Sequence, residues 1–375
     1  MSVHITSSQP PASRPSLLTE AVRSWDRFWF TPTDPTTVCF IRLLCGAVAF
    51  YVCLTYSWGL FSYVGPNGWV DERMNDYMLR ELPLYGPAVE WSDTNPQIGE
   101  GHYYWSIYFH VRSPGWIVAI HSFFLVCILL YTVGLWCPYT GPLCWLASIS
   151  YVHRAWATVY GVDTLVMILL AYLLIAPAGA VFSMDRWLAV RRARRLGLPD
   201  PPVAPSVRAN FAIRLIQVHF CMIYFASGSS KLLGSMWWNG TAMNQVLLNP
   251  MFTPMDSPVF LNALKILAIS RWVWELFATL GCLFTLWVEL TFIFLVWDMR
   301  WRWLILIGSI SMHVGIGLMM GLTTFSIIML VMVASFFSAE SVRIVVDEYA
   351  AIARRLFRRR AATVPRPDEK LVMSR

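Results

Sequence analysis

Five ionisable side chains lie within or at the ends of strongly apolar segments: Arg42, Asp163, Lys231, Glu289 and His313. An ionisable group inside a membrane span is costly unless it is paired, hydrated or neutral, so each needs a specific reason to be there. Lysine is the strongest candidate for chemistry among them. In a poorly hydrated pocket its charged form is disfavoured, and the neutral amine can then accept a proton. The pattern therefore predicts a lysine base at position 231.

The sequence around this lysine is typical of a pocket at the end of a helix. Small residues at 227–230 precede Lys231, and "MWWNGTA" follows it. The small residues allow the backbone to leave the helix, and the segment after them could fold back to line a cavity. Trp237 and Trp238 would then form an aromatic wall for a flat ligand. The alternative is a lysine at a helix end that extends its charge to the lipid headgroups.

The other ionisable residues each have a structural and a functional interpretation. His313 lies in "SMHVGIGLMMG", whose glycines permit close helix approach. It either satisfies a hydrogen bond between helices or orients a ligand and passes a proton. Glu289 is either a neutral acid hydrogen-bonded to a neighbour or the partner of Arg42. Of these two interpretations we favour the structural ion pair with Arg42. Asp163 follows "YGV" at a predicted helix start, where N-capping explains a carboxylate.

The composition is that of an all-α polytopic membrane protein. Of the 375 residues, 57% are hydrophobic and only 14% are charged, and the mean hydropathy is +0.53. Apolar runs near the ~20 residues that cross a bilayer recur from residue 38 to residue 338. We predict an integral membrane helix bundle of about eight transmembrane helices. Their expected ranges are 38–58, 116–136, 140–157, 163–181, 209–228, 272–297, 302–320 and 322–339.

Basic segments fix the orientation of these helices. The loop 185–208, "DRWLAVRRARRLGLPDPPVAPSVR", should stay cytoplasmic because Lys and Arg are enriched on that side. With eight spans, Arg300, Arg302 and the basic tail also fall inside, as do both termini. The acidic loop 59–115 then falls outside. The agreement of three basic regions favours an even number of spans.

We divide the chain into three regions. Residues 1–35 are polar and rich in Pro, Ser and Thr, and we expect a mobile arm. Residues 36–340 form the membrane domain, and residues 341–375 form a basic amphipathic cytoplasmic tail. The tail either lies along anionic headgroups or is simply solvated. The external loop 59–115 is either a lid over the bundle or a docking surface for an external protein partner.

Several function classes are disfavoured. The net charge is +7, but the basic residues lie in loops and the tail rather than in one stripe with interleaved aromatics, so no nucleic-acid partner is expected. The eight cysteines lie mostly in apolar spans without a CxxC pair, and no metal is predicted. The motifs GxxxxGK[ST], HExxH and GxSxG are absent from the sequence. Without inverted repeats, a transporter is a distant third interpretation.

Three segments resemble a known membrane domain. They are "TPTDPTTVCFIRLLCG" (31–46), "MIYFASGSSKLLGSMWWNGTA" (222–242), and "VELTFIFLVW" followed by "HVGIGLMMG" (288–321). Together they resemble the membrane domain of vitamin K-dependent gamma-carboxylase, and more closely its short bacterial relatives, the horizontally transferred transmembrane domain (HTTM) proteins. The resemblance covers roughly residues 25–338.

The resemblance implies a site and a reaction. In the carboxylase family the membrane domain binds vitamin K hydroquinone, and a lysine starts its oxygenation as a base; the product then drives carboxylation of a peptide glutamate. Lys231 matches that lysine, His313 a histidine of a later helix, and Glu289 an acidic residue upstream of it. Arg42 matches the arginine after the "PTDP" motif, and Asp163 lies in "GVDTL", similar to a bacterial "GDTL" segment. We expect no large lumenal platform for a substrate after residue 338.

Two hypotheses of different classes follow. In the first, the protein is an enzyme of the bacterial inner membrane, a carboxylase-like lyase or oxygenase. Lys231 deprotonates a reduced quinone, and the protein or peptide acceptor is reached from outside. In the second, it is a noncatalytic membrane module that binds a lipid, a quinone or an external protein, and Lys231 only supplies a charge at the mouth of the pocket.

Overall fold

The computed structural model describes residues 16–74, 105–249, 254 and 257–363, and within them the chain is helical. The described part contains two isolated bridge pairs, Thr33 with Ser206 and Asn67 with Asp71, but no extended strand. This confirms the all-α class. The external loop 59–115 falls partly outside the described residues, which resume at 105.

Five helices are long and apolar enough to cross a bilayer. This makes the chain a multi-pass membrane protein. The first continues through short turns as far as Val64. The five are α2 (Thr36–Tyr56), α5 (Pro114–Val133), α9 (Val207–Lys231), α13 (Arg271–Leu295) and α14 (Arg302–Met319).

The other three predicted spans are also helices, but they are shorter or less apolar. α7 (Gly161–Ile175) and α15 (Thr323–Val333) are apolar but have fewer than 18 residues, and a 3-10 turn, η4 (Ala334–Phe336), extends α15. α6 (Cys137–Arg154) has Pro138 in its first turn and carries Pro142 in its interior. Each of the eight apolar segments therefore contains a helix, and five of them meet the length and hydropathy of a span.

Short elements complete the chain between the long helices. They are η1 (Ser57–Gly59), α3 (Leu60–Val64), η2 (Ile107–Phe109), η3 (Trp156–Thr158), α8 (Met184–Arg195), α10 (Ser235–Trp238), α11 (Ala242–Leu248) and α12 (Pro258–Leu267). α10 to α12 return the chain after α9 towards the start of α13, and Trp274 Nε1 of α13 donates to Asn244 Oδ1 of α11 at 2.9 Å.

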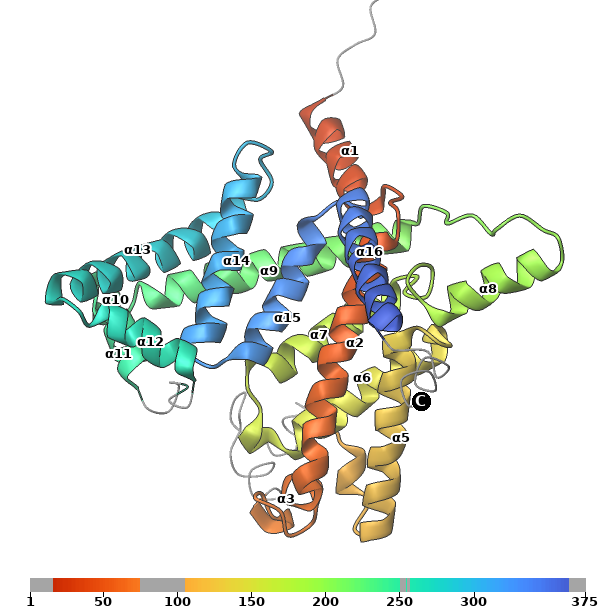
Figure 1. Ribbon diagram of the computed structural model, residues 1–375, viewed down its shortest axis with the longest axis horizontal. Coiled ribbons are helices and arrows are strands. Elements are labelled where there is room, and N and C mark those ends of the chain that lie inside the picture. The colour runs from red at the N-terminus through yellow and green to blue at the C-terminus, as the bar shows by residue number, and fades with distance from the viewer. Residues whose placement is uncertain (1–15, 75–104, 250–253, 255–256, 364–375) are drawn as a thin grey trace, which may run out of the picture.

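The helices pack as two groups that share α15 (Figure 1). In one group α2 packs against α5 and α7, while α6 lies between α5 and α7. In the other, α13 lies along α9, and α14 packs on α13 and α15. One continuous buried core runs through both groups, with Phe220, Phe292 and Leu169 fully buried in it. The second group carries Lys231, Glu289 and His313.

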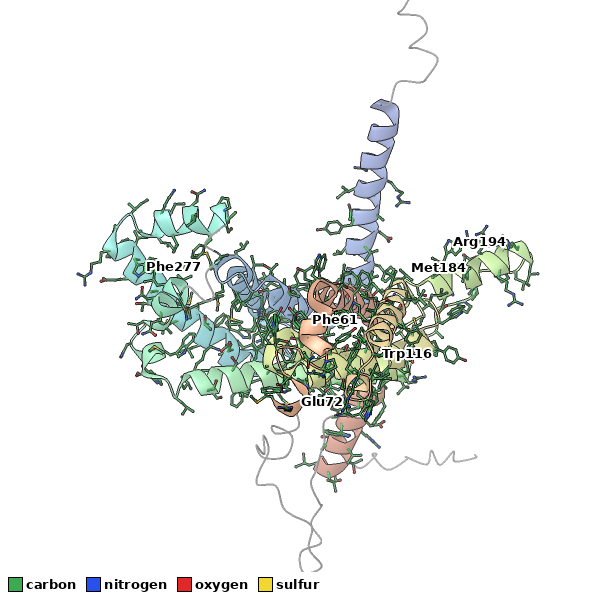
Figure 2. All side chains as sticks on the ribbon, turned by 90° about the horizontal axis from the view of Figure 1, so that it is seen from below. Phe61, Glu72, Trp116, Met184, Arg194 and Phe277 are labelled. Carbon is green, nitrogen blue, oxygen red and sulfur yellow. The ribbon has the colours of Figure 1, made fainter. Side chains whose placement is uncertain are left out.

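Helices also form at both ends of the described chain. α1 (Leu17–Phe30) lies inside the segment expected to be a mobile arm. Ser16 caps it by accepting from Thr19 N, and Asn210 Nδ2 of α9 binds the carbonyls of Phe28 and Trp29 at 2.8 and 2.9 Å, which fixes its far end. α16 (Ala339–Thr363) stands out from the bundle, as Figure 2 shows.

Candidate functional site

Lys231 ends α9 and meets Glu289, which lies deep in α13. The ammonium nitrogen is 2.7 Å from Glu289 Oε2, 2.8 Å from Oε1 and 2.6 Å from Ser227 Oγ. Ser227 Oγ in turn donates to Glu289 Oε1 at 3.1 Å. The three side chains therefore form a closed triangle of hydrogen bonds around one ion pair.

A glycine brings the two helices close enough for this triangle. A Cβ atom at Gly228 would lie 2.9 Å from Leu290 Cδ2 and 3.1 Å from Glu289 Cβ, so a larger residue would require these side chains to shift. Ser227 and Lys231 are four residues apart and share one face of α9. The small residues that the sequence analysis expected to bend the chain out of the helix instead remain helical as far as Lys231.

The ion pair lies near the rim of the bundle rather than in its centre. The side chain of Lys231 is 21% exposed and that of Glu289 is 9% exposed. The ammonium nitrogen lies 5.4 Å from the ring centroid of Trp237, within cation–π range. Trp238 is 69% exposed and donates its Nε1 hydrogen to the Leu232 carbonyl at 2.7 Å. Of the predicted aromatic wall, Trp237 is the residue that lies against the ammonium.

His313 belongs to a second polar cluster in the same group of helices. Its Nε2 is 2.7 Å from the hydroxyl of Tyr224, which is also 2.8 Å from Ser309 Oγ. His313 is buried, and its Nδ1 has no hydrogen-bond partner in the part of the chain that the structure describes. The interhelical hydrogen bond expected for an intramembrane histidine is therefore present.

Both clusters share one face of α9. Tyr224, Gly228 and Lys231 follow the i, i+4, i+7 spacing of a helix face, and 7 residues correspond to about 10 Å along the axis. Glu289 approaches this face from α13, and His313 approaches it from α14. Three of the predicted site residues, Lys231, Glu289 and His313, thus lie at the interface of α9, α13 and α14.

Arg42 lies elsewhere and does not pair with Glu289, so that prediction was wrong. The fully buried Arg42 guanidinium donates to the carbonyls of Tyr131 at 2.7 Å, Thr132 at 2.9 Å and Phe182 at 2.5 Å. The last carbonyls of a helix lack intrahelical partners and carry the negative end of its dipole, so they attract a cation. Arg42 therefore closes the end of α5 and holds the chain that leads into α8.

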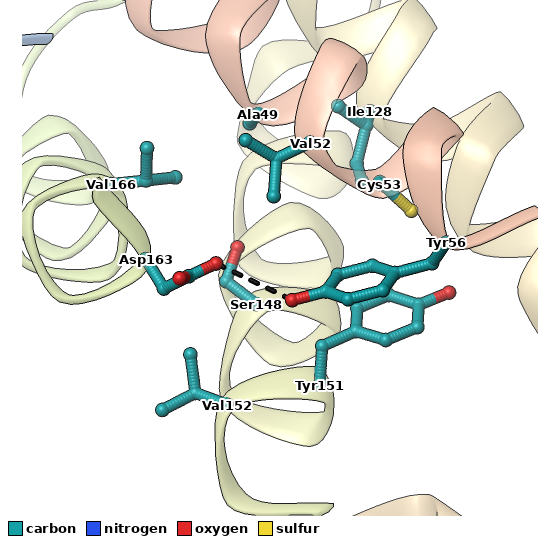
Figure 3. Close-up of a pocket in the computed structure, with 10 residues that line it drawn as sticks. All are labelled: Ala49, Val52, Cys53, Tyr56, Ile128, Ser148, Tyr151, Val152, Asp163 and Val166. Atoms are coloured by element: carbon teal, nitrogen blue, oxygen red, sulfur yellow. Dashed lines mark hydrogen bonds between the residues drawn. The ribbon is translucent and has the colours of Figure 1, made fainter. Parts of the chain in front are cut away.

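Asp163 is also remote from Lys231, in the first turn of α7. Its Oδ2 accepts from the Tyr160 backbone N–H at 3.0 Å, as the capping interpretation predicted, and its Oδ1 lies 3.4 Å from the Tyr56 hydroxyl. A cavity of about 30 Å³ lies between α2, α6 and α7 beside this carboxylate (Figure 3). The ring of Tyr56 stacks on Tyr151, and the two hydroxyls point in opposite directions.

A much larger apolar groove lies between α2, α14, α15 and the first turns of α16. Its volume is about 1060 Å³, and its walls are almost wholly apolar. Phe40 and Leu44 of α2, Ile310 of α14, and Ile327 of α15 form its walls, and Val345 of α16 lies over it. None of the residues around the Lys231 ammonium lines this groove.

Sequence reasoning missed Tyr224 and Ser309. The signal was present in the spacing: Tyr224 precedes Lys231 by seven residues, and Ser309 precedes His313 by four, so each pair shares a helix face. A tyrosine and a serine in apolar helices are too common to stand out without knowing which faces meet. Only the hydrogen bonds between α9 and α14 in the folded protein identify them as partners of the histidine.

The hydrogen-bonded pairs of this site have a geometry suited to proton exchange. A lysine and a carboxylate in direct hydrogen-bond contact can share one proton, and a tyrosine hydroxyl next to an imidazole can pass one. The eight cysteines are buried free thiols, and within the described residues no three His, Cys, Asp or Glu side chains gather in a group suited to a metal. Comparison of the chain with protein-family models, curated proteins and solved structures finds no match.

Proposed function

We propose that the protein is an eight-span HTTM-like protein of the bacterial inner membrane, with both termini in the cytoplasm. In this proposal Lys231 and Glu289 accept a proton from a reduced quinone near the outer face of the membrane. The single observation that carries it is the Lys231–Glu289 pair, held by Ser227 in an apolar helix interface with Trp237 beside it. A charge pair of this kind in a span is otherwise a costly feature.

The proposed proton path uses the two charged groups in turn. The Lys231 ammonium gives one proton to Glu289 across 2.7 Å, which leaves a neutral amine and a carboxylic acid. The amine then takes the hydroxyl proton of the quinol, so that the ammonium forms again and a quinolate anion remains beside it. The ammonium stabilises this anion, and the face of Trp237 supports the flat ring. Oxygen or carbon dioxide is the co-substrate of the later steps, and the acceptor is a protein or peptide outside.

The test compares turnover and quinone content in three variants. Lys231→Ala should abolish oxygen-dependent oxidation of a soluble quinol while the protein stays folded. Glu289→Gln should lower the rate, because the amine then lacks its proton acceptor. Trp274→Phe, on the same helix but outside the triangle, serves as the control and should retain the rate. Unchanged turnover in Lys231→Ala would rule the proposal out.

A noncatalytic binding module is the second candidate, and two observations favour it. Glu289 Oε1, Glu289 Oε2 and Ser227 Oγ together engage all three hydrogens of the Lys231 ammonium, as in a purely structural ion pair. The large apolar groove also offers a site for the chain of a lipid or quinone.

This second role is tested separately from the first. Ala47 is exposed and lines the groove, so Ala47→Trp should partly block it and release a co-purifying lipid or quinone. Ala119→Trp, an exposed position on α5 outside the groove, is the matched control. Lys231→Arg should be nearly silent in this role. If Ala47→Trp retains the same lipids as wild type, the groove is not the binding site.

A further inference from the structure

α8 is held by hydrogen bonds at its N-terminal end and is rich in arginine at its C-terminal end. At its base, Asp185 accepts from the backbone N–H groups of Trp136 at 2.9 Å and Cys137 at 3.3 Å, and Ser183 caps the helix by accepting from Arg186 N at 3.0 Å. Beyond this base the helix extends away from the bundle, as Figure 1 shows, and Met184 and Arg194 mark it in Figure 2. The helix is therefore fixed at one end and free along most of its length.

One face of α8 combines tryptophan with arginine. Trp187, Arg191, Arg194 and Arg195 follow helical spacing and line a hollow of about 380 Å³ together with Val190. The guanidinium of Arg191 lies 5.0 Å from the Trp187 ring centroid. Trp187 is 52% exposed, and the neighbouring side chains of Leu188 and Met184 are also exposed.

On the opposite side, the chain that follows the helix contacts its C-terminal end. Ala193 is buried, and its carbonyl accepts from Leu198 N at 2.9 Å. The segment from Leu196 to Ser206 returns to α9 along the upper side of α8 in Figure 1. Trp187 and the arginines of the aromatic and basic face remain exposed.

Of the three arginines on this face, Arg194 is paired with a carboxylate, whereas Arg191 and Arg195 form no ion pair within the described part of the chain. Asp185 is occupied by backbone N–H groups at the base, and Asp200 pairs with Arg194 through two hydrogen bonds of 2.9 and 2.7 Å. Among the residues that the structure describes, no carboxylate forms an ion pair with Arg191, Arg192 or Arg195. The face thus carries a net positive charge beside an exposed indole ring.

We propose that this face of α8 docks on the anionic phospholipid headgroups of the bilayer that surrounds the bundle. In the chain, α8 lies between the end of α7 and the start of α9, so it is at the level of the membrane where one apolar helix ends and the next begins. Tryptophan is favoured at the depth of the headgroups, and the guanidinium group binds phosphate through paired hydrogen bonds. Arginines next to an anionic surface each strengthen binding about fivefold. This inference does not depend on the chemistry at Lys231.

The test measures lipid binding to the full-length protein by native mass spectrometry. Protein in mild detergent receives equal amounts of phosphatidylglycerol and phosphatidylcholine, and wild type should bind phosphatidylglycerol preferentially. The variant R191Q/R194Q/R195Q should bind phosphatidylglycerol more than tenfold more weakly, with little change for phosphatidylcholine. Trp187→Ala should weaken binding of both lipids, because the indole contributes without regard to headgroup charge.

A charge-matched control separates a docking face from overall charge. The variant R23Q/R27Q/R300Q removes three exposed arginines outside α8 and should change phosphatidylglycerol binding less than twofold. If the triple α8 variant does not fold, R191Q/R195Q spares the Arg194–Asp200 pair and answers the same question. An equal loss in the control, or wild-type protein without any preference for phosphatidylglycerol, would overturn the proposal.

Discussion

Glu289 binds the Lys231 ammonium with both of its carboxylate oxygens, at 2.8 and 2.7 Å, from a helix that lies alongside α9. The two charges come from segments 58 residues apart, and each is largely removed from water. An ion pair of this kind adds little stability compared with two well-packed apolar residues at the same positions. Breaking it is costly, however, because one charge is left without a partner. Removing either residue alone is therefore expected to lower the stability of the fold.

Replacing Glu289 by Gln should destabilise the fold by about 2–4 kcal/mol, because the Lys231 charge stays in place without a counter-charge. The same substitution at Glu275 is the control. Glu275 lies on the same helix and pairs with Arg271, but both are exposed, so the loss should stay below about 0.5 kcal/mol. Unfolding in a denaturing detergent gives both values. The double variant K231A/E289A is compared with K231A and E289A. If its loss of stability equals the sum of the losses of these two single variants, the residues are not coupled.

Tyr224→Phe should cost about 1–2 kcal/mol, since the hydroxyl is the hydrogen-bond partner of both His313 and Ser309. Tyr139→Phe on α6 is a suitable comparison because Tyr139 is 75% exposed. It should be neutral within about 0.5 kcal/mol. The same unfolding assay measures the difference, and equal losses at the two positions would show that the Tyr224 hydroxyl has no special role.

Gly134→Ala should be among the most damaging small substitutions in the chain. Gly134 has a φ of +76°, and an added Cβ would lie 2.6 Å from Arg42 Nη1 and 2.5 Å from Ser183 Cβ. Gly197 has a similar φ of +70° but open space around it, so Gly197→Ala isolates the backbone strain. We expect Gly197→Ala to lower the free energy of unfolding by about 1 kcal/mol and Gly134→Ala to lower it by about 3 kcal/mol or more. Similar losses would mean that crowding around Arg42 adds nothing.

The Asp34–Arg343 pair predicts a pH dependence at the start of α16. Partial burial opposes ionisation of Asp34, but hydrogen bonds from Thr36 and the guanidinium of Arg343 outweigh it and hold the Asp34 pKa below its ordinary value of 3.8. The folded state therefore binds this proton less readily than the unfolded state. The stabilisation is present above the ordinary pKa and is lost as the pH falls through the lowered one.

Asp34→Asn should accordingly lower stability by up to about 1 kcal/mol at neutral pH, a small effect because the pair is partly exposed. The difference between wild type and variant should stay constant from pH 7 to about pH 5 and shrink below about pH 4. Unfolding measured over this pH range tests it. A gap that persists unchanged at pH 3 would assign the effect to packing instead of to the charge of Asp34.

The sequence predicted the helices better than the contacts between them. Hydrophobic runs located all eight helical segments, because burial in a bilayer requires long apolar stretches. The pairing of Lys231 with Glu289 was not predictable, since sequence spacing does not determine which faces of separate helices meet. The expected partner of Glu289 was Arg42, whose guanidinium instead binds three backbone carbonyls, two of them at the end of α5, which no residue pattern reveals.

Two helical segments were predicted as a polar arm and a basic loop. α1 has a serine cap and regular apolar spacing, and α8 begins with a capping serine and an early aspartate and ends in arginines. These are ordinary signals of helix starts and ends. Both segments are polar overall, however, and polar segments between apolar runs are typical of connecting chain. Taken alone, the local capping signals would have identified both helices.

The Arg42 guanidinium joins three parts of the chain: it begins in α2, binds the end of α5 and also holds the Phe182 carbonyl that leads into α8. The direction of α8 is therefore set by the interior of the protein and not by the lipid around it. A bundle with a fixed lateral arm has only one tilt and one depth at which the arm lies flat in the headgroup layer. If the bilayer is thicker or thinner, the resulting force on α8 would reach the rest of the protein through the contacts of Arg42.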